Sequence, residues 1–128
     1  MPADSPRLNT SRFNYPALVG KLLYLSNCTR PDITAAVNYL SRFMSAPNEL
    51  HWEQAKRVLR YVKGTMHYTL TFSGQCSPDP LCFQDASYAD GPSRRSRTGY
   101  VVLMCGAAIV WGSRLQTTVA LVLLMQNT

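Results

Sequence analysis

The sequence predicts an α+β fold in which a helical half precedes a half made of antiparallel strands. Between positions 14 and 64, apolar residues recur every three or four positions, which is typical of helices that bury one face. After position 80, short strand-like runs are separated by turn formers. The stretch GQCSPDP, residues 74–80, marks the change between the two patterns. We expect a disordered lead-in over 1–13, a helical segment over 14–74 and a β-rich segment over 75–128.

Length and composition are those of a folded protein that does not span a membrane. The 128 residues suffice for one domain or two incomplete ones, and 46% of them are hydrophobic. No run approaches the eighteen or more uncharged apolar residues of a membrane span, and the N-terminus lacks the apolar core of a secretory signal. We therefore expect a soluble intracellular protein, in the cytoplasm or nucleus, with no membrane partner.

Two helices are expected in the first 45 residues. The first begins near Asn14, which can cap it, with Pro16 in its first turn. In the second, Thr29 can cap and Pro31 suits the first turn. The expected buried stripes are Leu18, Leu22 and Leu25 in the first helix, and Ile33, Val37, Leu40 and Met44 in the second.

The third expected helix, NELHWEQAKRVLRYVKG over residues 48–64, has the most regular pattern and ends at Gly64. Its buried stripe is expected to be Trp52, Ala55, Leu59 and Val62. The opposite side carries four cations, Lys56, Arg57, Arg60 and Lys63. This row can follow a phosphate backbone, or it can be a solvated face whose cations suit the helix C-terminus. The spacing alone leaves both interpretations open.

Strand patterns follow the third helix. HYTLTFSG, residues 67–74, alternates apolar and polar side chains, as a half-buried strand does. Three further runs, LCFQDAS, TGYVVLMC and AAIVWGS, are expected to be successive antiparallel strands. The last two are separated by little more than Gly106, so we expect a hairpin there.

The charge balance favours a polyanionic partner. Thirteen Lys and Arg against seven Asp and Glu give a net charge of +6, and RNA or DNA is the commonest partner for such an excess. Beyond the third helix, a turn carries Arg94, Arg95 and Arg97. The turn can contact phosphates or can simply be exposed to solvent, and the residue types do not decide between these alternatives.

The cysteines and histidines do not form a zinc motif. Four cysteines are spread singly without a CxxC pair, and neither histidine lies near them. Because a chain of this size needs no disulfide and nothing marks it as secreted, we expect reduced, mostly buried thiols.

Asp85 lies in the first of the three strand runs, where a carboxylate can hold Mg²⁺. Two-metal hydrolysis of a phosphodiester needs several converging carboxylates, and no Asp or Glu follows Asp90 in the sequence. A single strand aspartate is more often structural than a ligand.

Several motifs in order resemble one family. The segment "YPALVGKLLYLSNCTRPDITAAVNYLSRFMSAPNELHWEQAKRVLRYVKGT", residues 15–65, is similar to a region downstream of the polymerase palm in copia-type retrotransposon Pol polyproteins. "RRSRTGYVV" and "VWGSRLQTTVAL" resemble motifs of the RNase H region of the same polyproteins. The resemblance covers roughly residues 13–121. It implies a three-helix, thumb- or connection-like segment at the end of the reverse transcriptase, followed by the first antiparallel strands of an incomplete RNase H-like fold.

The resemblance also implies where catalysis is incomplete. Asp85 matches the first aspartate of the RNase H region, which holds Mg²⁺ in the family, but Ser87 stands where the family has its second aspartate. Asp90 stands where the family usually has glycine, so it is not carried over as a ligand. The glutamate that follows "TVAL" in the family and the Y.DD turn of the polymerase are absent from this sequence. We therefore expect Asp85 to be the remnant of a metal site, in an inactive polyprotein fragment with no stably bound cofactor.

Three hypotheses follow. The first is a catalytically incomplete fragment of the polyprotein. The second is a retained binding module for an RNA–DNA hybrid or a nucleic-acid duplex, acting through the cations of the third helix and of the arginine turn. The third is an RNase H that takes its missing carboxylates from a second chain, which the need for rigidly placed ligands disfavours. We also expect self-association through an exposed sheet.

Overall fold

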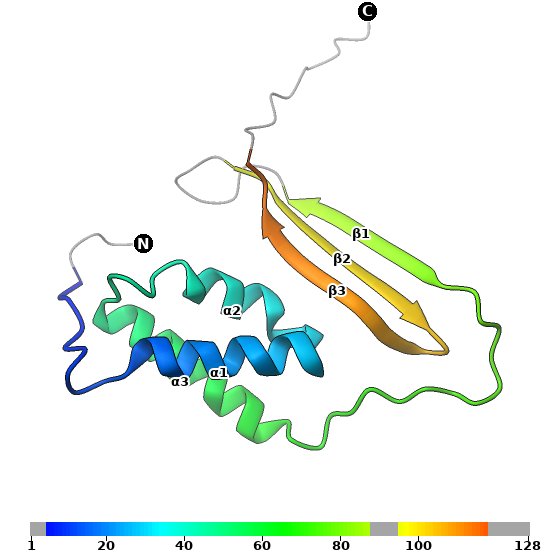
Figure 1. The fold of residues 1–128 in the computed structure, drawn as a ribbon, viewed down its shortest axis with the longest axis horizontal. Helices are drawn as coiled ribbons and strands as arrows, with labels where there is room; N and C mark the ends of the chain where they lie inside the picture. Colours follow the sequence, from blue (N-terminus) through cyan, green and yellow to red (C-terminus); the bar gives the residue numbers. More distant parts are fainter. Residues whose placement is uncertain (1–4, 88–94, 118–128) are drawn as a thin grey trace, which may run out of the picture.

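The computed structural model describes residues 5–87, without the side chain of Ser87, and residues 95–117. Three packed helices form one part of the molecule and a three-stranded antiparallel sheet forms the other (Figure 1). Of the strands, β3 lies nearest the helices and β1 lies farthest away (Figure 1). None of the described helices combines the length and the apolar character needed to cross a membrane.

The first two helices are α1, Tyr15–Cys28, and α2, Thr34–Ser41. As predicted, Asn14 caps α1, and its side-chain oxygen accepts a hydrogen bond from the backbone N–H of Ala17 at 3.1 Å. The prediction for Thr29 was wrong, because its backbone N–H closes the end of α1 on the carbonyl of Leu25. A short 3₁₀ helix, η1, Pro31–Ile33, then leads into α2.

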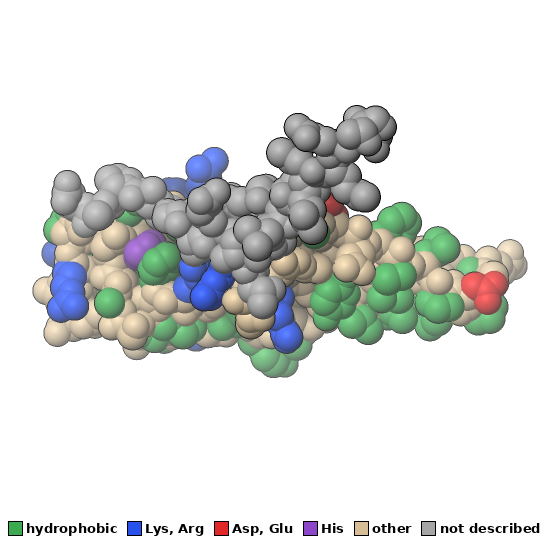
Figure 2. Space-filling model, turned by 90° about the horizontal axis from the view of Figure 1, so that it is seen from above, with side chains coloured by type: hydrophobic (Ala, Val, Ile, Leu, Met, Phe, Trp, Pro, Cys, Tyr) green, Lys and Arg blue, Asp and Glu red, His purple; other side chains and the backbone are tan. Residues whose placement is uncertain are grey.

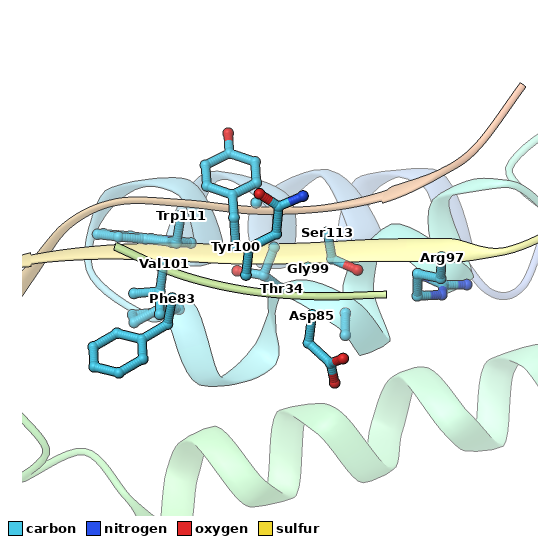
Figure 3. Close-up of a pocket in the computed structure, with 13 residues that line it drawn as sticks. Thr34, Phe83, Asp85, Arg97, Gly99, Tyr100, Val101, Trp111 and Ser113 are labelled. Carbon is cyan, nitrogen blue, oxygen red and sulfur yellow. The ribbon is translucent and has the colours of Figure 1, made fainter. Parts of the chain in front are cut away.

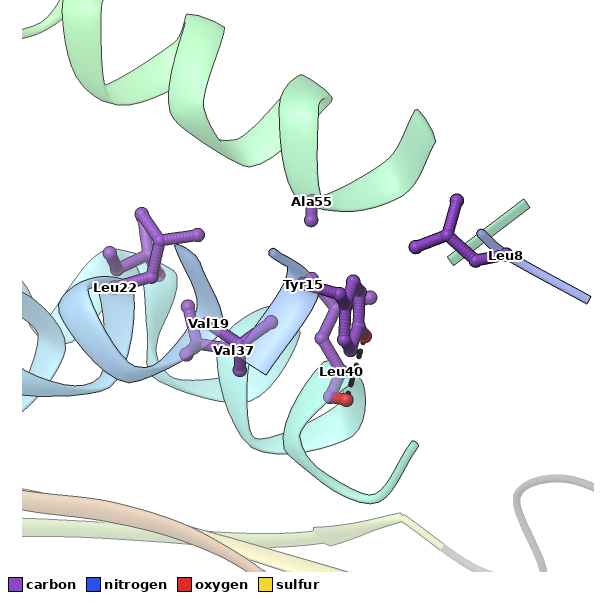
Figure 4. Close-up of a cluster of buried hydrophobic side chains, with 8 residues drawn as sticks. Leu8, Tyr15, Val19, Leu22, Val37, Leu40 and Ala55 are labelled. Atoms are coloured by element: carbon purple, nitrogen blue, oxygen red, sulfur yellow. Dashed lines mark hydrogen bonds between the residues drawn. The ribbon is translucent and has the colours of Figure 1, made fainter. Parts of the chain in front are cut away.

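The hydrophobic core lies among the helices (Figure 4). At its centre the Tyr15 side chain is fully buried, and its hydroxyl donates to the carbonyl of Leu40 at 2.8 Å. Burial raises the pKa of Tyr15 to about 12. The other buried apolar members are Leu8, Val19, Leu22, Ile33, Val37, Leu40 and Ala55.

Helix α3, Glu49–Gly64, ends at the predicted glycine but presents a different apolar stripe. Leu59 was predicted to be buried and is 45% exposed, whereas Val58 packs against the core. His51 and Ala55 are the buried residues of α3. Val58 and Val62 continue the same side of the helix at spacings of three and four residues, and Leu59 falls outside this stripe. The remaining predicted members, Trp52 and Val62, do pack against the core.

His51 begins α3 through a reciprocal cap. Its backbone N–H donates to the Asn48 side chain at 2.8 Å, and its Nδ1 accepts from the Asn48 backbone at 3.2 Å. The His51 ring stacks on Phe43 with 3.9 Å between centroids. Burial lowers the pKa of His51, so the neutral ring that accepts this hydrogen bond is favoured.

No strand forms over residues 67–74, so this prediction was wrong. The alternating side chains find no neighbouring strand there, and Tyr68 and Phe72 remain more than half exposed. Residues 65–80 instead run from the end of α3 to the far end of the sheet (Figure 1). The backbone N–H of Ser73 donates to the carbonyl of Cys105 at 2.9 Å, which holds this connection against the turn of the hairpin.

The sheet has the order β1-β2-β3, with β1 Leu81–Ser87, β2 Arg97–Met104 and β3 Ala107–Leu115. These are the three strands that the sequence predicts, within two residues at each end. The predicted hairpin turns at Cys105 and Gly106, where both φ angles are positive, as a two-residue type I′ turn requires. Asp85 pairs with Gly99 across β1 and β2, and Gly99 pairs with Ser113 across β2 and β3.

A disulfide joins Cys76 of the connection to Cys105 of the hairpin turn, with 5.3 Å between their Cα atoms. The expectation of four reduced thiols is therefore corrected for this pair. The two cysteines are 29 residues apart in sequence, and they meet because the connection returns to the hairpin turn. Cys28 and Cys82 are free thiols as expected, but both are exposed, so the expectation of buried thiols was wrong for them.

Candidate nucleic-acid interface

Helix α3 presents its basic residues on the side away from the core. Arg57, Arg60 and Lys63 are exposed, and Lys56 is partly exposed. Lys56 forms an ion pair with Glu53 at 2.5 Å, which reduces its availability to a ligand. The other ion pair in the described part of the chain does not involve α3, so Arg57, Arg60 and Lys63 are the cations of this helix that can meet phosphates.

The structure brings one arginine of the predicted turn close to α3. Arg97 begins β2, and it lines a groove of about 680 Å³ between α2 and α3 together with Arg57. Two aromatic side chains, Tyr39 and Tyr61, line the same groove. Arg60, Lys63 and the exposed Arg95 do not line it, and Arg94 falls outside the described residues.

Lys and Arg side chains gather over the helical part on the face seen in Figure 2, whereas hydrophobic side chains dominate the remote part of the sheet. The charge is thus unevenly distributed over this face. A phosphate backbone that follows the basic residues would run over the helices and past the near end of the sheet.

Arg30 and Asp32 of the TRPDI motif form a fork-to-fork ion pair. Nε and one terminal nitrogen of Arg30 donate to the two Asp32 oxygens at 2.9 and 2.8 Å. Arg30 also donates to the carbonyl of Thr65 at 3.2 Å, and the Tyr61 hydroxyl donates to Asp32 at 2.9 Å. The hydrogen bond from Arg30 holds the pKa of Asp32 below its usual value. From the sequence, this motif was predicted only to start a helix. In the structure, the contacts of Arg30 and Asp32 with Thr65 and Tyr61 also hold the end of α3 against η1.

Asp85 lies on the side of the sheet opposite to Tyr100, together with Phe83 and Val101 (Figure 3). It lines a cavity of about 610 Å³ between the sheet and the start of α2, where it is the sole carboxylate among the lining residues and Arg97 is the sole cation. Its Oδ1 accepts a hydrogen bond from the adjacent Ala86 N–H at 2.8 Å.

The described residues do not fit a magnesium centre. Nowhere among them do three or more His, Cys, Asp or Glu side chains come close enough to hold a metal ion. A two-ion phosphodiesterase needs several carboxylates, and the Asp85 cavity supplies one. Asp90 and the side chain of Ser87 lie outside the described residues.

A polar stripe on α2 faces the edge of β3, and sequence reasoning did not identify it. Asn38 donates from Nδ2 to the carbonyl of Ser113 at 2.8 Å, and the Trp111 indole donates to the carbonyl of Ser26 at 2.8 Å. Arg42 and Arg114 line the cleft between these elements. The sequence did contain a pattern that could have predicted this stripe. Polar residues recur at helical spacing on the side of α2 opposite its apolar stripe, at Thr34, Asn38, Ser41 and Arg42.

Comparison with known proteins identifies relatives over most of the chain. It is 44% identical over 116 residues to the retrovirus-related Pol polyprotein from transposon TNT 1-94 of Nicotiana tabacum, covering 88% of this chain and 8% of that protein. It is 44% identical over 108 residues to secreted RxLR effector protein 161 of Plasmopara viticola, covering 84% and 76% respectively. The putative transposon Ty5-1 protein of Saccharomyces cerevisiae is 39% identical over 103 residues, covering 78% of this chain and 33% of that protein. No protein-family profile and no solved structure matches the chain.

The relatives and the ordered motifs agree. The chain belongs to the Pol polyproteins of copia-type retrotransposons, of which it is a fragment. It spans less than a tenth of the length of the tobacco polyprotein.

Proposed function

We propose that the chain corresponds to the end of a reverse transcriptase followed by the first strands of an RNase H, and that it binds nucleic-acid backbone without catalysing a reaction. The polyprotein relatives and the order of the motifs support this assignment. The helical part supplies the binding surface, and the sheet carries Asp85 as the remnant of a metal site. An RNA–DNA hybrid or a duplex is the expected partner.

The observation that carries the proposal is the row of unpaired cations on α3. Arg57, Arg60 and Lys63 are exposed and free of ion pairs within the described residues, and Arg97 extends the row from another element. Cations that only keep a helix soluble are usually interspersed with acids along the same face. Beyond the Glu53–Lys56 pair, the C-terminal half of α3 carries no acid.

The salt dependence of binding tests this proposal. Each phosphate contact releases counterions and adds about 0.9 to the slope of log affinity against log salt. Replacing Arg57, Arg60 and Lys63 by alanine should therefore flatten the slope for an RNA–DNA hybrid by about 2 to 3. A matched control replaces three exposed cations outside α3, Arg7 and Arg12 of the N-terminal segment and Lys21 of α1, by alanine. If the two triple variants change the slope equally, α3 is not the interface.

The absence of catalysis is a separate prediction. The chain should not hydrolyse the RNA strand of a hybrid with Mg²⁺ or Mn²⁺, since Asp85 alone cannot hold two ions. Metal-dependent cleavage that disappears in Asp85→Asn would show that the site is complete, and would favour carboxylates recruited from a second chain.

A further inference from the structure

The cleft between α2 and β3 has the composition of an anion site. It encloses about 490 Å³, and three arginines from three different elements line it: Arg42 at the end of α2, Arg97 at the start of β2 and Arg114 near the end of β3. Among the described lining residues there is no carboxylate, although Thr34, Arg97 and Ser113 also line the adjoining cavity that contains Asp85. Neither ion pair of the described chain involves these arginines. Three guanidinium groups around one cleft repel each other in the absence of an anion.

Two buried hydroxyl groups in this cleft lack hydrogen-bond partners. They are Oγ1 of Thr34 and Oγ of Ser113, the two buried side-chain polar atoms in the described structure without a partner. Thr34 is only 5% exposed, and both residues line the cleft. Leaving a buried hydroxyl unpaired is unfavourable, because the group has lost its hydrogen bonds to water. A ligand with acceptor oxygens would satisfy both groups at the place where the arginines supply positive charge.

An aromatic ring stands beside the cleft in a fixed position. Tyr100 lies over Gly112 of the paired strand, where an added Cβ would lie 2.8 Å from the nearest ring atom. Tyr100 is 43% exposed and lines the cleft. Figure 3, which draws the adjoining Asp85 cavity, shows its ring on the side of the sheet away from Asp85. Gly112 thus leaves room for the ring over the paired strand, whereas Ser113 projects to the other side of the sheet, the side of Asp85.

We propose that this cleft binds the phosphate group of a nucleotide, with the oxyanion between Arg42, Arg97 and Arg114 and accepting hydrogen bonds from Thr34 and Ser113. Arginine forks and hydroxyl donors are the groups that recognise phosphate oxygens. The site goes beyond the proposed function: it shares Arg97 with that surface but uses none of the cations of α3. The phosphate can be carried by a free nucleotide or by a single-stranded nucleic acid, since the same chemistry recognises both.

Calorimetric titration with two probes tests the site and distinguishes the two sources. One probe is adenosine monophosphate and the other is a short oligothymidylate, whose internal phosphates are diesters. Binding of the first alone assigns the cleft to free nucleotides, and binding of the second assigns it to a strand. If neither probe binds the chain at low salt, the proposal is overturned.

The double variant Arg42→Gln with Arg114→Gln should weaken binding of the probe by about tenfold or more, because two charge-assisted contacts are lost. Both side chains are exposed, so the fold should persist. The matched control is Arg7→Gln with Arg12→Gln, which lowers the net charge equally. Equal weakening in the double variant and in its control would overturn the proposal.

Thr34→Val separates binding from folding. Because its hydroxyl has no partner without ligand, replacing it with a methyl group should leave the melting temperature unchanged or raise it, while weakening probe binding. Unchanged probe binding would exclude Thr34 from the site. The α3 variant Arg57→Ala, Arg60→Ala, Lys63→Ala should still bind the nucleotide probe, so failure of the α3 interface and failure of this site give different results.

Discussion

The helical part and the sheet differ in how much apolar surface they bury. The helices and the segment before them contribute all eight members of the core cluster. In the sheet, Ala107 and Ala108 are the buried apolar residues among those described, while Leu81, Phe83 and Val110 are half exposed or more. Since apolar burial is the main favourable term in folding, the helical part should account for most of the stability. The strands of this sheet form their backbone hydrogen bonds with one another, but most of their large apolar side chains are not buried against another layer.

The largest expected difference is between truncations of a large apolar side chain to alanine in the helical part and in the sheet, measured as loss of unfolding free energy. Leu40→Ala removes a side chain that is 1% exposed and should cost about 3 kcal/mol of unfolding free energy. Phe83→Ala removes a larger side chain that is 55% exposed and should cost less than about 1 kcal/mol. Chemical denaturation followed by far-ultraviolet circular dichroism measures both. Equal losses would break the comparison.

Removing the clamp at the end of α3 should have an intermediate effect. Arg30→Gln breaks the ion pair with Asp32 and the contact with Thr65, which should cost about 2 kcal/mol. Because the folded pKa of Asp32 lies below its unfolded value, this stabilisation is present above about pH 4 and is lost as the pH falls through the folded pKa. The loss of stability on acidification should therefore be smaller in Arg30→Gln than in the parent chain. A parallel pH profile in the two proteins would show that the pair does not stabilise the fold.

Self-association should involve the sheet and not the helices. We propose that a second copy pairs with β1, the edge strand of the described sheet that lies away from the helices, whose residues 81–86 are all exposed and include no Lys, Pro or bulge. Antiparallel pairing centred on Gln84 would place Phe83 opposite Asp85 of the other copy. Phe83→Asp would then set two carboxylates against each other and should shift the chain toward monomer in sedimentation velocity. Tyr24→Asp, at an exposed position of α1, is the control and should leave the distribution unchanged.

Local features were predictable from sequence. The Asn14 cap, the end of α3 at Gly64 and the hairpin at Gly106 each depend on a few neighbouring residues, and the structure confirms them. The basic side of α3 was also predictable, because helical spacing fixes which residues share a face. By contrast, choosing Val58 instead of Leu59 for the core depends on how α3 is rotated against α1 and α2.

Features that join distant segments were not predictable. The strand expected over 67–74 needed a neighbouring strand that the fold does not supply, and the Cys76–Cys105 disulfide needed the connection to return to the hairpin turn. The cleft between α2 and β3 likewise joins residues about 75 positions apart, as the Asn38 to Ser113 hydrogen bond does. Whether the sheet belongs to an RNase H-like fold remains a prediction.

Hydrogen exchange tests the central claim, that the helical part carries the stability of the fold. In the monomeric chain at neutral pH, backbone amides of α1 and α3 should exchange only through global unfolding of the chain. Backbone amides of β1, β2 and β3 should exchange faster, through local opening of the sheet. Strand amides protected as well as, or better than, those of the helices in a monomer would contradict the claim that burial in the helices dominates.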